Sequence, residues 1–255
     1  MAGPILGKRL KDINVREARL RWPVKLDADL TDQELLRIDR RGKYLLFHFR
    51  SGALILHLGM SGRLSVVNIS TPLIKHDHID FVFEHNVVLR FNDARRFGSV
   101  HFSREPQCHW LLRRLGPEPL EDAYNADYMF DKSRQVRQSI KPFVMNSKVV
   151  VGIGNIYANE ALFRSGIRPR IAAGRVSRNR YKLLVRESKI ILREAIEVGG
   201  TTLRDYFGSN GERGYFAQSL DVYGREGKTC RICSTALRSI RLGQRATVYC
   251  PKCQR

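Results

Sequence analysis

Cys230-Arg231-Ile232-Cys233 and Cys250-Pro251-Lys252-Cys253 are two C-x2-C pairs near the end of the chain, separated by residues 234–249. Each pair can present two thiolates to one metal ion, and four thiolates complete the closed tetrahedron of a structural zinc site. Two disulfides are the alternative, and they are less favoured because no secretory segment precedes the pairs. We therefore predict one structural Zn²⁺, bound by Cys230, Cys233, Cys250 and Cys253.

The stretch between the cysteine pairs predicts a β-hairpin. Apolar residues recur from Leu237 to Tyr249, and Gly243-Gln244 supplies a turn between two short strands. A zinc ribbon folded in this way carries Gln244 and Arg245 at the tip of a rigid hairpin. The pattern points firmly to a metal and, by itself, says little about function.

The composition indicates a polyanionic partner. The 255 residues include 45 Lys and Arg against 25 Asp and Glu, a formal net charge of +20. Nucleic acid is the first candidate, and an anionic membrane surface is the second. No apolar run is long enough to span a bilayer, and residues 1–7 do not resemble a signal peptide. We expect a reduced, cytoplasmic protein, in which Cys108 is a buried or half-buried small apolar residue.

The first part of the chain alternates short apolar runs with turn signals, which predicts antiparallel sheets folded as a sandwich or a barrel. Residues 44–49 show partial alternation, and residues 53–58 form a more continuous apolar run. Gly116-Pro117-Glu118-Pro119 then marks a domain boundary. The expected strands are residues 8–24, 35–49, 53–58, 62–68, 78–83, 87–91 and 98–102.

After this boundary the apolar period becomes helical. Pro142 suits the first turn of a helix, and Gly199-Gly200 suits a helix end. Residues 201–219 contain several glycines and predict a long loop, which in a compact protein is usually functional or disordered. The expected helices are residues 126–139, 141–151, 156–165 and 177–198. The expected domains are a β domain, a helical domain and a zinc ribbon, at residues 1–116, 117–219 and 220–255.

Three short stretches carry residues that suit a phosphate or a metal. Gly152-Ile153-Gly154-Asn155 places backbone N–H groups at a helix start, which suits a phosphate oxygen, and a capped turn without a ligand is an equal alternative. Lys43 begins a strand and points away from Tyr44, so a solvated basic face is favoured over a cleft. His76-Asp77-His78 puts two imidazoles on one face of a strand, but polar or phosphate contacts are favoured over metal because no third ligand is evident.

Two turns combine apolar side chains with nearby cations. Met60 lies between glycines in Gly59-Met60-Ser61-Gly62, and Phe97 follows two arginines in Asp93-Ala94-Arg95-Arg96-Phe97-Gly98. Apolar side chains on loops beside Arg can insert into a base stack from the minor groove. A local hydrophobic contact is the favoured alternative as long as these turns are considered alone.

Further motifs occur in a fixed order along the chain. They are Arg41-Gly42-Lys43-Tyr44-Leu45, His57-Leu58-Gly59-Met60-Ser61-Gly62, Lys75-His76-Asp77-His78, Asp93-Ala94-Arg95-Arg96-Phe97-Gly98, Leu115-Gly116-Pro117-Glu118-Pro119, Ile140-Lys141-Pro142, Val151-Gly152-Ile153-Gly154-Asn155-Ile156-Tyr157 and Gly199-Gly200-Thr201-Thr202-Leu203. With the ribbon, this set resembles the bacterial formamidopyrimidine-DNA glycosylase family, also called 8-oxoguanine DNA glycosylase, from about Gly7 to the last residue. The resemblance implies an α+β multidomain fold: an N-terminal antiparallel β-sandwich, a helical domain with a helix–two-turn–helix element and a C-terminal zinc ribbon.

The resemblance also implies roles for individual residues. Lys43 and Arg245 are implied to be catalytic, with Lys43 near the lesion phosphate during the lyase steps. Residues 204–219 match the loop that closes over the everted base. The implied DNA-binding residues are Met60, Arg95 and Phe97, which fill the gap left by that base, and His76, Arg137, Lys141, Asn155 and Arg245.

The implied activity is base-excision repair. The resemblance suggests a DNA glycosylase with AP lyase activity on oxidised purines such as 8-oxoguanine and formamidopyrimidines. Its partner is double-stranded DNA containing oxidised bases or abasic sites, and it is expected to be a monomer, cytoplasmic and nucleoid-associated, with no membrane partner. A non-catalytic protein that binds damaged DNA is the alternative. A general basic scaffold, such as a ribosome-associated protein, does not explain the ordered motifs.

One part of the family pattern does not match. The family begins with Pro-Glu-Leu-Pro-Glu-Val-Glu, whose proline amine attacks the sugar and whose first glutamate is an acid and base, whereas this chain begins Met1-Ala2-Gly3-Pro4-Ile5-Leu6. Pro4 cannot substitute, because its nitrogen is part of an amide and is not nucleophilic. We expect little or no glycosylase activity from these 255 residues as they stand. A mis-assigned or truncated start is favoured over a protein that is shortened in nature.

Overall fold

The computed structural model describes residues 3–26, 29–199 and 220–255. These residues form two compact units, one up to residue 113 and the other from residue 114 onward. Each unit has a hydrophobic core of its own. The contacts within each unit therefore account for its fold.

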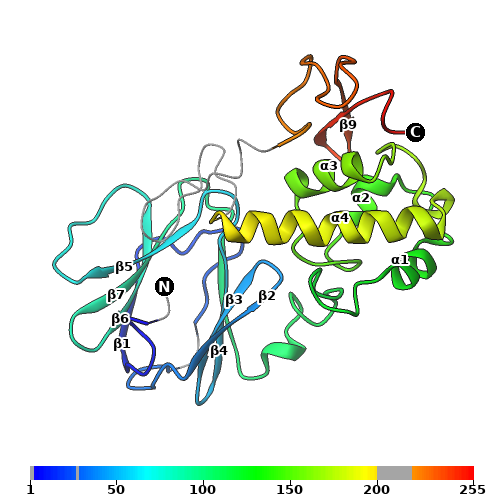
Figure 1. Ribbon diagram of the computed structural model, residues 1–255. Coiled ribbons are helices and arrows are strands. Elements are labelled where there is room, and N and C mark those ends of the chain that lie inside the picture. Colours follow the sequence, from blue (N-terminus) through cyan, green and yellow to red (C-terminus); the bar gives the residue numbers. More distant parts are fainter. Residues whose placement is uncertain (1–2, 27–28, 200–219) are drawn as a thin grey trace. The chain divides into compact units, whose positions relative to one another are not determined.

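Two four-stranded antiparallel sheets make up the first unit (Figure 1). One sheet has the strand order β1-β6-β7-β5, and the other has the order β2-β3-β4-β8. The described strands are not shared between the sheets, so the chain folds as a sandwich and not as a barrel. The strands are β1 (Leu10–Val15), β2 (Arg37–Arg41), β3 (Tyr44–Phe49), β4 (Gly52–His57), β5 (Arg63–Asn68), β6 (Asp77–Phe83), β7 (Val87–Asn92) and β8 (Ser99–Ser103), followed by the 3-10 turn η1 (Pro106–Cys108).

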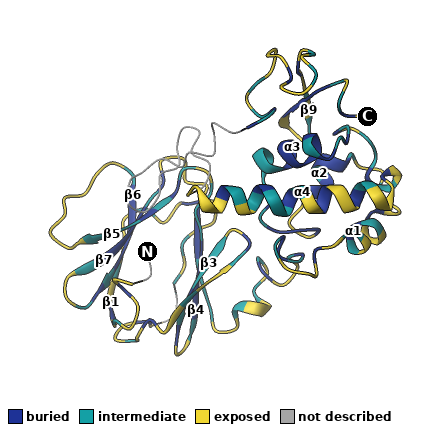
Figure 2. Ribbon diagram, in the orientation of Figure 1, coloured by how far each residue is buried: buried dark blue, intermediate teal, exposed yellow. Residues whose placement is uncertain are grey.

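Side chains from both sheets build one core. Along β3, Leu45, Phe47 and Phe49 belong to this core, as the period-two alternation of a strand requires. Ile79 and Phe91 come from the other sheet, are fully buried and belong to the same cluster. Burying such a side chain is worth roughly 1.5–3 kcal/mol. Figure 2 shows the buried residues on both sheets, so the apolar faces hold the sandwich together.

Two predicted strands differ in extent from the structure. The stretch 8–24 contains only β1, because the N–H of Arg16 turns to the carbonyl of His78. The stretch 35–49 is divided into β2 and β3 by a tight turn at Gly42, whose φ of 57° favours glycine. The other predicted strands match closely.

Helices form the second unit from residue 114 onward. The longest is amphipathic, with Tyr181, Leu184 and Ile191 buried at helical spacing against the other helices. Figure 2 shows its opposite face as exposed. None of the described helices is long and apolar enough to cross a membrane. The helices are α1 (Ala126–Ser133), α2 (Ile140–Val144), α3 (Asn155–Arg164) and α4 (Arg178–Glu197), with the 3-10 turn η2 (Ala173–Arg175) before α4.

Two predicted helices are shorter in the structure. The helix expected over 126–139 ends at Ser133, and the helix expected over 141–151 is reduced to α2. The carbonyl of Asn146 accepts the N–H groups of Val149 and Val150 in turns. A run of β-branched valines resists helix formation, which agrees with this early end.

The two later helices match their predictions, and α4 is followed by Gly199 with a φ of 75°, as expected of a residue after a helix end. Gly200 and the predicted loop at 201–219, including the stretch 204–219, lie outside the described residues.

The predicted ribbon hairpin is confirmed. Strands β9 (Arg238–Leu242) and β10 (Arg245–Tyr249) pair antiparallel. The turn residues Gly243 and Gln244 both have positive φ, at 53° and 58°, which is the geometry of a two-residue type I′ turn. Phe163 of α3 packs into the small core of the ribbon, so the hairpin rests on that helix.

Cys108 is exposed in the turn η1. The prediction that it is a buried or half-buried apolar residue is therefore wrong. The backbone leaves β8 at Ser103 and enters a turn in which Glu105, Gln107 and Cys108 are all exposed.

Candidate nucleic-acid interface

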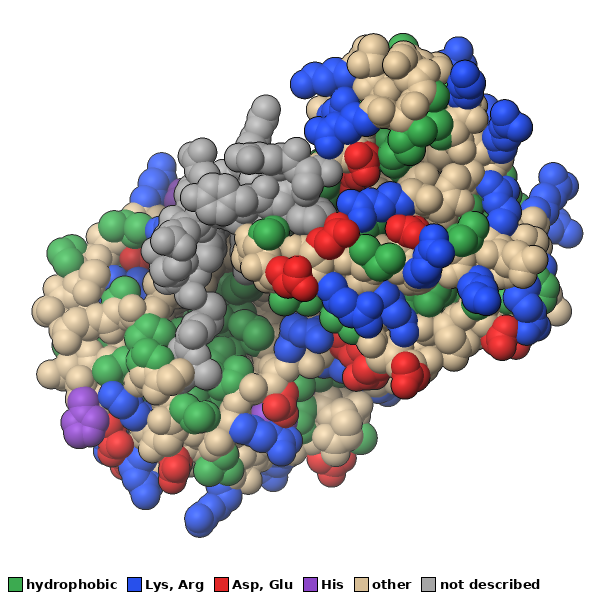
Figure 3. Space-filling model, in the orientation of Figure 1, with side chains coloured by type: hydrophobic (Ala, Val, Ile, Leu, Met, Phe, Trp, Pro, Cys, Tyr) green, Lys and Arg blue, Asp and Glu red, His purple; other side chains and the backbone are tan. Residues whose placement is uncertain are grey.

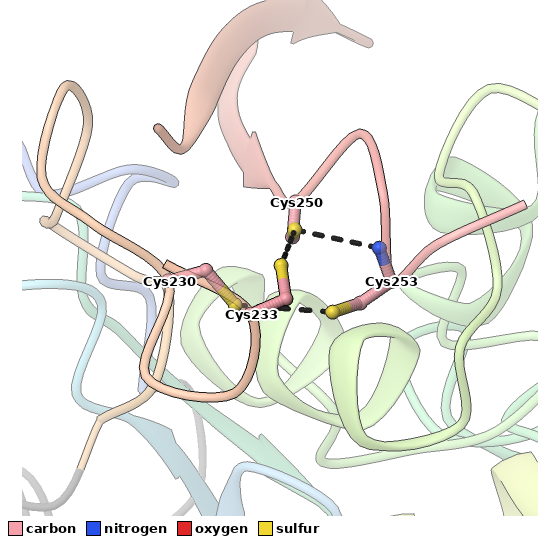
Figure 4. Close-up of side chains that lie close together, drawn as sticks. All are labelled: Cys230, Cys233, Cys250 and Cys253. Carbon is pink, nitrogen blue, oxygen red and sulfur yellow. Dashed lines mark hydrogen bonds between the residues drawn. The ribbon is translucent and has the colours of Figure 1, made fainter. Parts of the chain in front are cut away.

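The four cysteines of the ribbon face one another (Figure 4). Their sulfur atoms all lie within 4.8 Å of one another, and the Sγ atoms of Cys233 and Cys250 are 3.4 Å apart. Tetrahedral zinc with Zn–S bonds of about 2.3 Å places sulfurs about 3.8 Å apart, so the set fits one Zn²⁺. All four cysteines are free of disulfides. The zinc prediction is thus confirmed and the two-disulfide alternative is wrong.

A buried carboxylate fixes the start of the ribbon segment to helix α3. Glu160 is 1% exposed and accepts hydrogen bonds from the backbone N–H groups of Asp221, Val222 and Tyr223, at 2.8, 3.0 and 2.8 Å. Burial raises the pKa of Glu160, while the three N–H groups favour its charged form. The segment that leads into the ribbon is therefore held by a charge-assisted anchor.

A buried lysine joins the hairpin to α2. Lys141 has no exposed surface, and its Nζ donates to the carbonyl of Ala246 and to Oγ1 of Thr247, both at 2.7 Å. Burial lowers the pKa of Lys141 to about 8, and the charge of Arg245 acts in the same direction. Two of the three N–H donors of this ammonium are therefore used by the hairpin. A DNA contact by Lys141 stays a prediction.

Arg245 is the first residue of β10 and is exposed. Its carbonyl accepts a hydrogen bond from Oγ1 of Thr247 at 3.2 Å. The guanidinium thus extends from a backbone that is fixed by the turn, by the strand pairing and by this bond. A planar guanidinium on such a support suits two-pronged binding of a phosphate.

Helix α3 begins at Asn155, and no side chain caps its first turn. Gly154 holds the N-cap position in an extended conformation, after a turn in which Gly152 has a φ of 78°. Oδ1 of Asn155 is buried and has no hydrogen-bond partner among the described residues. Uncapped N–H groups at a helix start favour an anion. The first turn of α3 is thus uncapped, and a phosphate contact at Asn155 stays a prediction.

Lys and Arg side chains are frequent on the surface of the second unit (Figure 3). Figure 3 shows Lys and Arg side chains gathered over the helical part and the ribbon, with some Asp and Glu between them. Arg137 is exposed in the loop that joins α1 to α2. Other cations are paired, as Arg164 is with Glu194 at 2.9 Å. The exposed cations suit a phosphate backbone.

In the first unit, two loops meet at one buried carboxylate. Asp93 has no exposed surface, and its Oδ1 accepts from the hydroxyl of Ser61 at 2.6 Å. Its Oδ2 accepts from the N–H of Gly98 at 2.7 Å. A Cβ added to Gly59 would lie 2.5 Å from the backbone carbon of Phe97, so the two loops touch through their backbones. Glycine is therefore required at this position.

The same two loops carry the apolar residues that the sequence singled out. Met60 is 47% exposed and Phe97 is 41% exposed. The guanidinium carbon of Arg95 lies 4.8 Å from the centre of the Phe97 ring, which is a cation–π contact. The structure thus brings Met60, Arg95 and Phe97 into one surface site, and the exposure of both apolar side chains disfavours a purely local packing role.

His57 also holds the loop that carries Met60. Its Nδ1 accepts the N–H of Gly59 at 2.9 Å. Burial, with the nearby charge of Lys43, lowers the pKa of His57 to about 4, so Nδ1 remains an acceptor at neutral pH. Lys43 itself is exposed in the turn between β2 and β3. A lysine placed in this way lies close to the loop of Met60.

The stretch from His76 to His78 does not form a metal site. Nε2 of His78 bonds to the carbonyl of Asp93 at 2.8 Å, and the carboxylate of Asp77 accepts from the side chain of Asn92 at 2.8 Å. Among the described residues, the cysteines of the ribbon are the group that could hold a metal. The preference for polar contacts is confirmed for His78. A DNA contact by His76 stays a prediction.

Sequence reasoning missed three buried polar residues at these sites. Asp93 was part of a motif but had no assigned role, while Asn159 and Thr247 were not singled out. A signal existed for Asp93, because an aspartate at the start of a turn often accepts the backbone N–H two residues on, as it does here from Arg95. Nothing in the sequence distinguishes Asn159 or Thr247, because their partners lie far along the chain.

Three family models match the chain, one after another. Residues 1–100 match the N-terminal domain of formamidopyrimidine-DNA glycosylase. Residues 115–206 match the H2TH domain of the same enzyme, and residues 227–255 match the zinc finger found in FPG and IleRS. The matches follow the order of the β-sandwich, the helices and the ribbon.

Similar proteins share most of their length with this chain. A formamidopyrimidine-DNA glycosylase of Idiomarina loihiensis is 54% identical over 253 residues, which are 98% of this chain and 94% of that protein. One of Pseudomonas savastanoi pv. phaseolicola is 53% identical over 251 residues, with 98% and 93% covered.

Solved structures agree in fold. MutM (Fpg) of Thermus thermophilus superposes with a TM-score of 0.88 at 34% identity, covering 98% of this chain and 93% of that one. Lactococcus lactis Fpg in complex with DNA containing an abasic site gives a TM-score of 0.89 at 30% identity, with 100% and 95% covered.

Proposed function

Because the chain belongs to the formamidopyrimidine-DNA glycosylase family, we propose that it acts on double-stranded DNA in base-excision repair, at oxidised purines and at abasic sites. The observation that carries the proposal is the surface site at Asp93, where two loops hold Met60, Arg95 and Phe97 together. Solved relatives were obtained with DNA containing a formamidopyrimidine, carbocyclic 8-oxoguanine or an abasic site.

The chemistry of this site suits the replacement of an everted base. Extruding a base costs a few kcal/mol of stacking and pairing, and apolar side chains that enter the gap offset part of that cost. Met60 and Phe97 are the apolar side chains available, and Arg95 brings a cation with hydrogen-bond donors beside them. In this proposal Lys43, in the neighbouring turn, lies near the lesion phosphate.

The second unit is proposed to bind the phosphate backbone. Arg245, Asn155 and Arg137 supply a guanidinium, a helix start and a loop cation. The structural Zn²⁺ holds the hairpin that carries Arg245, and its four thiolates leave no position for a reacting group. Zinc therefore contributes to binding and not to bond cleavage.

We also propose the division into domains and the oligomeric state. The β domain (1–116), the helical domain (117–219) and the ribbon (220–255) are taken as three domains, and the protein as a monomer associated with the nucleoid. Sedimentation with a short abasic duplex tests the stoichiometry, with one protein per duplex expected. Two proteins on one lesion would contradict the monomer.

Binding preference tests the proposed function. Fluorescence anisotropy is expected to show tighter binding to duplexes containing 8-oxoguanine or an abasic analogue than to undamaged duplex. Met60→Ala and Phe97→Ala should reduce this preference about tenfold, because the gap is then unfilled. Leu36→Ala is the matched control, since Leu36 is also an exposed apolar residue, at 54%. Its N–H bonds to the carbonyl of His48, at the end of β3 opposite to the one that pairs with His57. Equal binding to damaged and undamaged DNA by the unaltered protein would sink the proposal.

Borohydride trapping separates the two candidate functions. On 8-oxoguanine DNA, a glycosylase with AP lyase activity gives a trapped covalent product, whereas a protein that only binds gives none. Weak trapping on a pre-formed abasic site remains open to an amine such as Lys43, which is exposed. Lesion-specific binding without trapping favours the non-catalytic binding protein. Strong trapping on 8-oxoguanine DNA favours the complete glycosylase and contradicts the expectation of impaired catalysis.

A further inference from the structure

Asn159 connects two parts of the second unit that are far apart in sequence. It lies in α3 and has no exposed surface. Its Oδ1 accepts the N–H of Val248 in β10 at 2.9 Å, a contact across 89 positions. Its Nδ2 donates to the carbonyl of Asn155, the first residue of α3, at 2.7 Å. One buried amide therefore holds both the backbone of the hairpin and the start of the helix.

Thr247 extends this connection to Arg245. The hydroxyl of Thr247 accepts from Nζ of Lys141 at 2.7 Å and donates to the carbonyl of Arg245 at 3.2 Å. Thr247 and Val248 are adjacent in β10, and both are buried. The backbone that carries the exposed Arg245 is thus fixed from α2 by Lys141 and from α3 by Asn159.

We propose that Asn159 is a positioning residue, which holds Arg245 and the uncapped start of α3 at a fixed spacing so that both meet the DNA backbone at once. The proposal rests on the DNA-binding function proposed above. Groups held in place before binding lose less freedom on binding. Asn159 touches no DNA itself, because its amide is buried and both of its polar atoms are satisfied within the protein.

A role in folding alone leads to a different expectation. The ribbon is also held by the anchor at Glu160, by the packing of Phe163 and by zinc. Removing the amide of Asn159 leaves these three supports in place. The hairpin then stays folded, while β10 is free to shift against α3, and Arg245 loses its register with the helix start.

The test measures how binding to an abasic-analogue duplex depends on KCl concentration. Each phosphate contact contributes about 0.9 to the slope of log K against log salt. Asn159→Leu should lower the slope by about one contact and weaken binding about tenfold at moderate salt. Asn159→Asp keeps the acceptor for Val248 but replaces the donor to the carbonyl of Asn155 with an oxygen, so it should also bind more weakly than the unaltered protein. One zinc per chain in each variant shows that the ribbon is still folded.

Two further variants decide whether Asn159 acts through Arg245. Arg245→Gln should lower the slope by the same amount, and adding Asn159→Leu to it should lower the slope no further. Ser165→Ala is the matched control, because Ser165 is a buried polar residue just after α3 whose hydroxyl bonds only to the preceding turn. It should leave both slope and affinity unchanged. If Asn159→Leu loses zinc, Asn159→Ala removes the same two hydrogen bonds without adding apolar bulk and gives the same readout.

The outcomes are distinct. An unchanged slope in zinc-loaded Asn159→Leu, or a slope that falls additively with Arg245→Gln, would overturn the role of Asn159. Failure of the unaltered protein to prefer the abasic duplex would instead overturn the proposed function. The role of Asn159 is therefore tested with the variants, and the proposed function is tested with the unaltered protein.

Discussion

At the scale of single residues, two buried side chains decide where Met60 and Phe97 lie. Asp93 receives hydrogen bonds from both loops, and His57 receives one from Gly59. Both side chains bond to the loops themselves. Their effect on DNA is therefore carried by the loops, and substitutions at these two residues test that link.

Asp93→Asn should destabilise the protein by about 1–3 kcal/mol, because one carboxylate oxygen becomes an NH2 group that faces a backbone N–H or a hydroxyl. Preference for damaged DNA should fall with it, since the loops of Met60 and Phe97 lose their common support. Chemical denaturation and the binding assay measure the two effects. Asp12→Asn is the control, because Asp12 is exposed and accepts only from the N–H of Ile13, and it should stay within about 0.5 kcal/mol. An equal effect of the two substitutions would contradict the role of Asp93.

Acid should weaken the support from His57. The pKa of this imidazole is lowered by burial to about 4 in the folded protein, from an ordinary 6.5. Between these values the unfolded chain binds more protons, so stability falls as the pH is lowered from 6.5 towards 4. The slope is at most about 1.4 kcal/mol per pH unit. His57→Asn keeps an acceptor in the position of Nδ1 and does not titrate, so its free energy of unfolding should fall less between pH 7 and 5. Parallel curves for the two proteins would refute this assignment.

At the scale of elements, helix α3 is the support for the ribbon. Its residues Asn159, Glu160 and Phe163 face the hairpin, the segment before the hairpin and the ribbon core. The ribbon core is small, so its stability depends on the helix and on the metal. Two predictions separate these contributions.

Glu160→Gln should loosen the segment that leads into the ribbon. A glutamine offers one oxygen, so at least one of the three backbone N–H groups loses its acceptor, at a cost of about 1–3 kcal/mol. Hydrogen exchange at Asp221, Val222 and Tyr223 should become faster, while exchange in α4 stays unchanged. Unchanged exchange at these three amides would show that the carboxylate is not their anchor.

Removing zinc should unfold the ribbon and spare the helices. Structural zinc contributes about 10 kcal/mol or more to the folding of small metal-bound domains. After chelation, trypsin should cut at Arg238, Arg241 and Arg245, which lie in the hairpin, and binding to DNA should fall sharply. Circular dichroism should retain the helical signal of α1 to α4. A protease pattern that does not change on chelation would argue against a zinc-dependent hairpin.

At the scale of the whole molecule, the net charge of +20 and the apolar side chains of Met60 and Phe97 contribute to DNA binding in different ways. Cations bind phosphates of any sequence and release counterions, whereas insertion of Met60 and Phe97 releases none. Raising the KCl concentration from about 50 to 200 mM should therefore weaken binding to damaged and undamaged duplex by similar factors. The ratio of the two binding constants, for damaged and for undamaged duplex, should change by less than about twofold. If the preference for damaged DNA disappears at high salt, the charged residues and not the apolar side chains cause it.

The sequence predicts a feature well when the interacting residues lie close together along the chain. The zinc site and its hairpin depend on residues within one short segment, so spacing and turn chemistry were enough. Most strands were found because a buried face imposes its own period. The order β1-β6-β7-β5 was not predictable from these patterns, because pairing depends on partners far along the chain. The helix expected at 141–151 ends early for a local reason, the run of valines, and for a distant one, since Val151 donates to the carbonyl of Pro117.

The supporting residues were hidden in the same way. Asp93 meets Ser61 across 32 positions, Asn159 meets Val248 across 89, and Lys141 meets Ala246 across 105. The resemblance implied DNA-binding roles for individual residues. It could not point to Asn159, because a positioning role appears only when the contacts are seen.

The exposed Cys108 has a practical consequence. Four of the five cysteines form the metal site, so a zinc-loaded molecule offers a single thiol to a maleimide dye, and a molecule stripped of zinc offers all of them. Hydrogen bonding to Glu105 raises the pKa of Cys108, so labelling should proceed faster in mildly alkaline buffer. Counting reactive thiols in one cuvette then reports the fraction of a preparation that carries its metal, and the attached dye provides a fluorescent reporter at a fixed point on the β-sandwich.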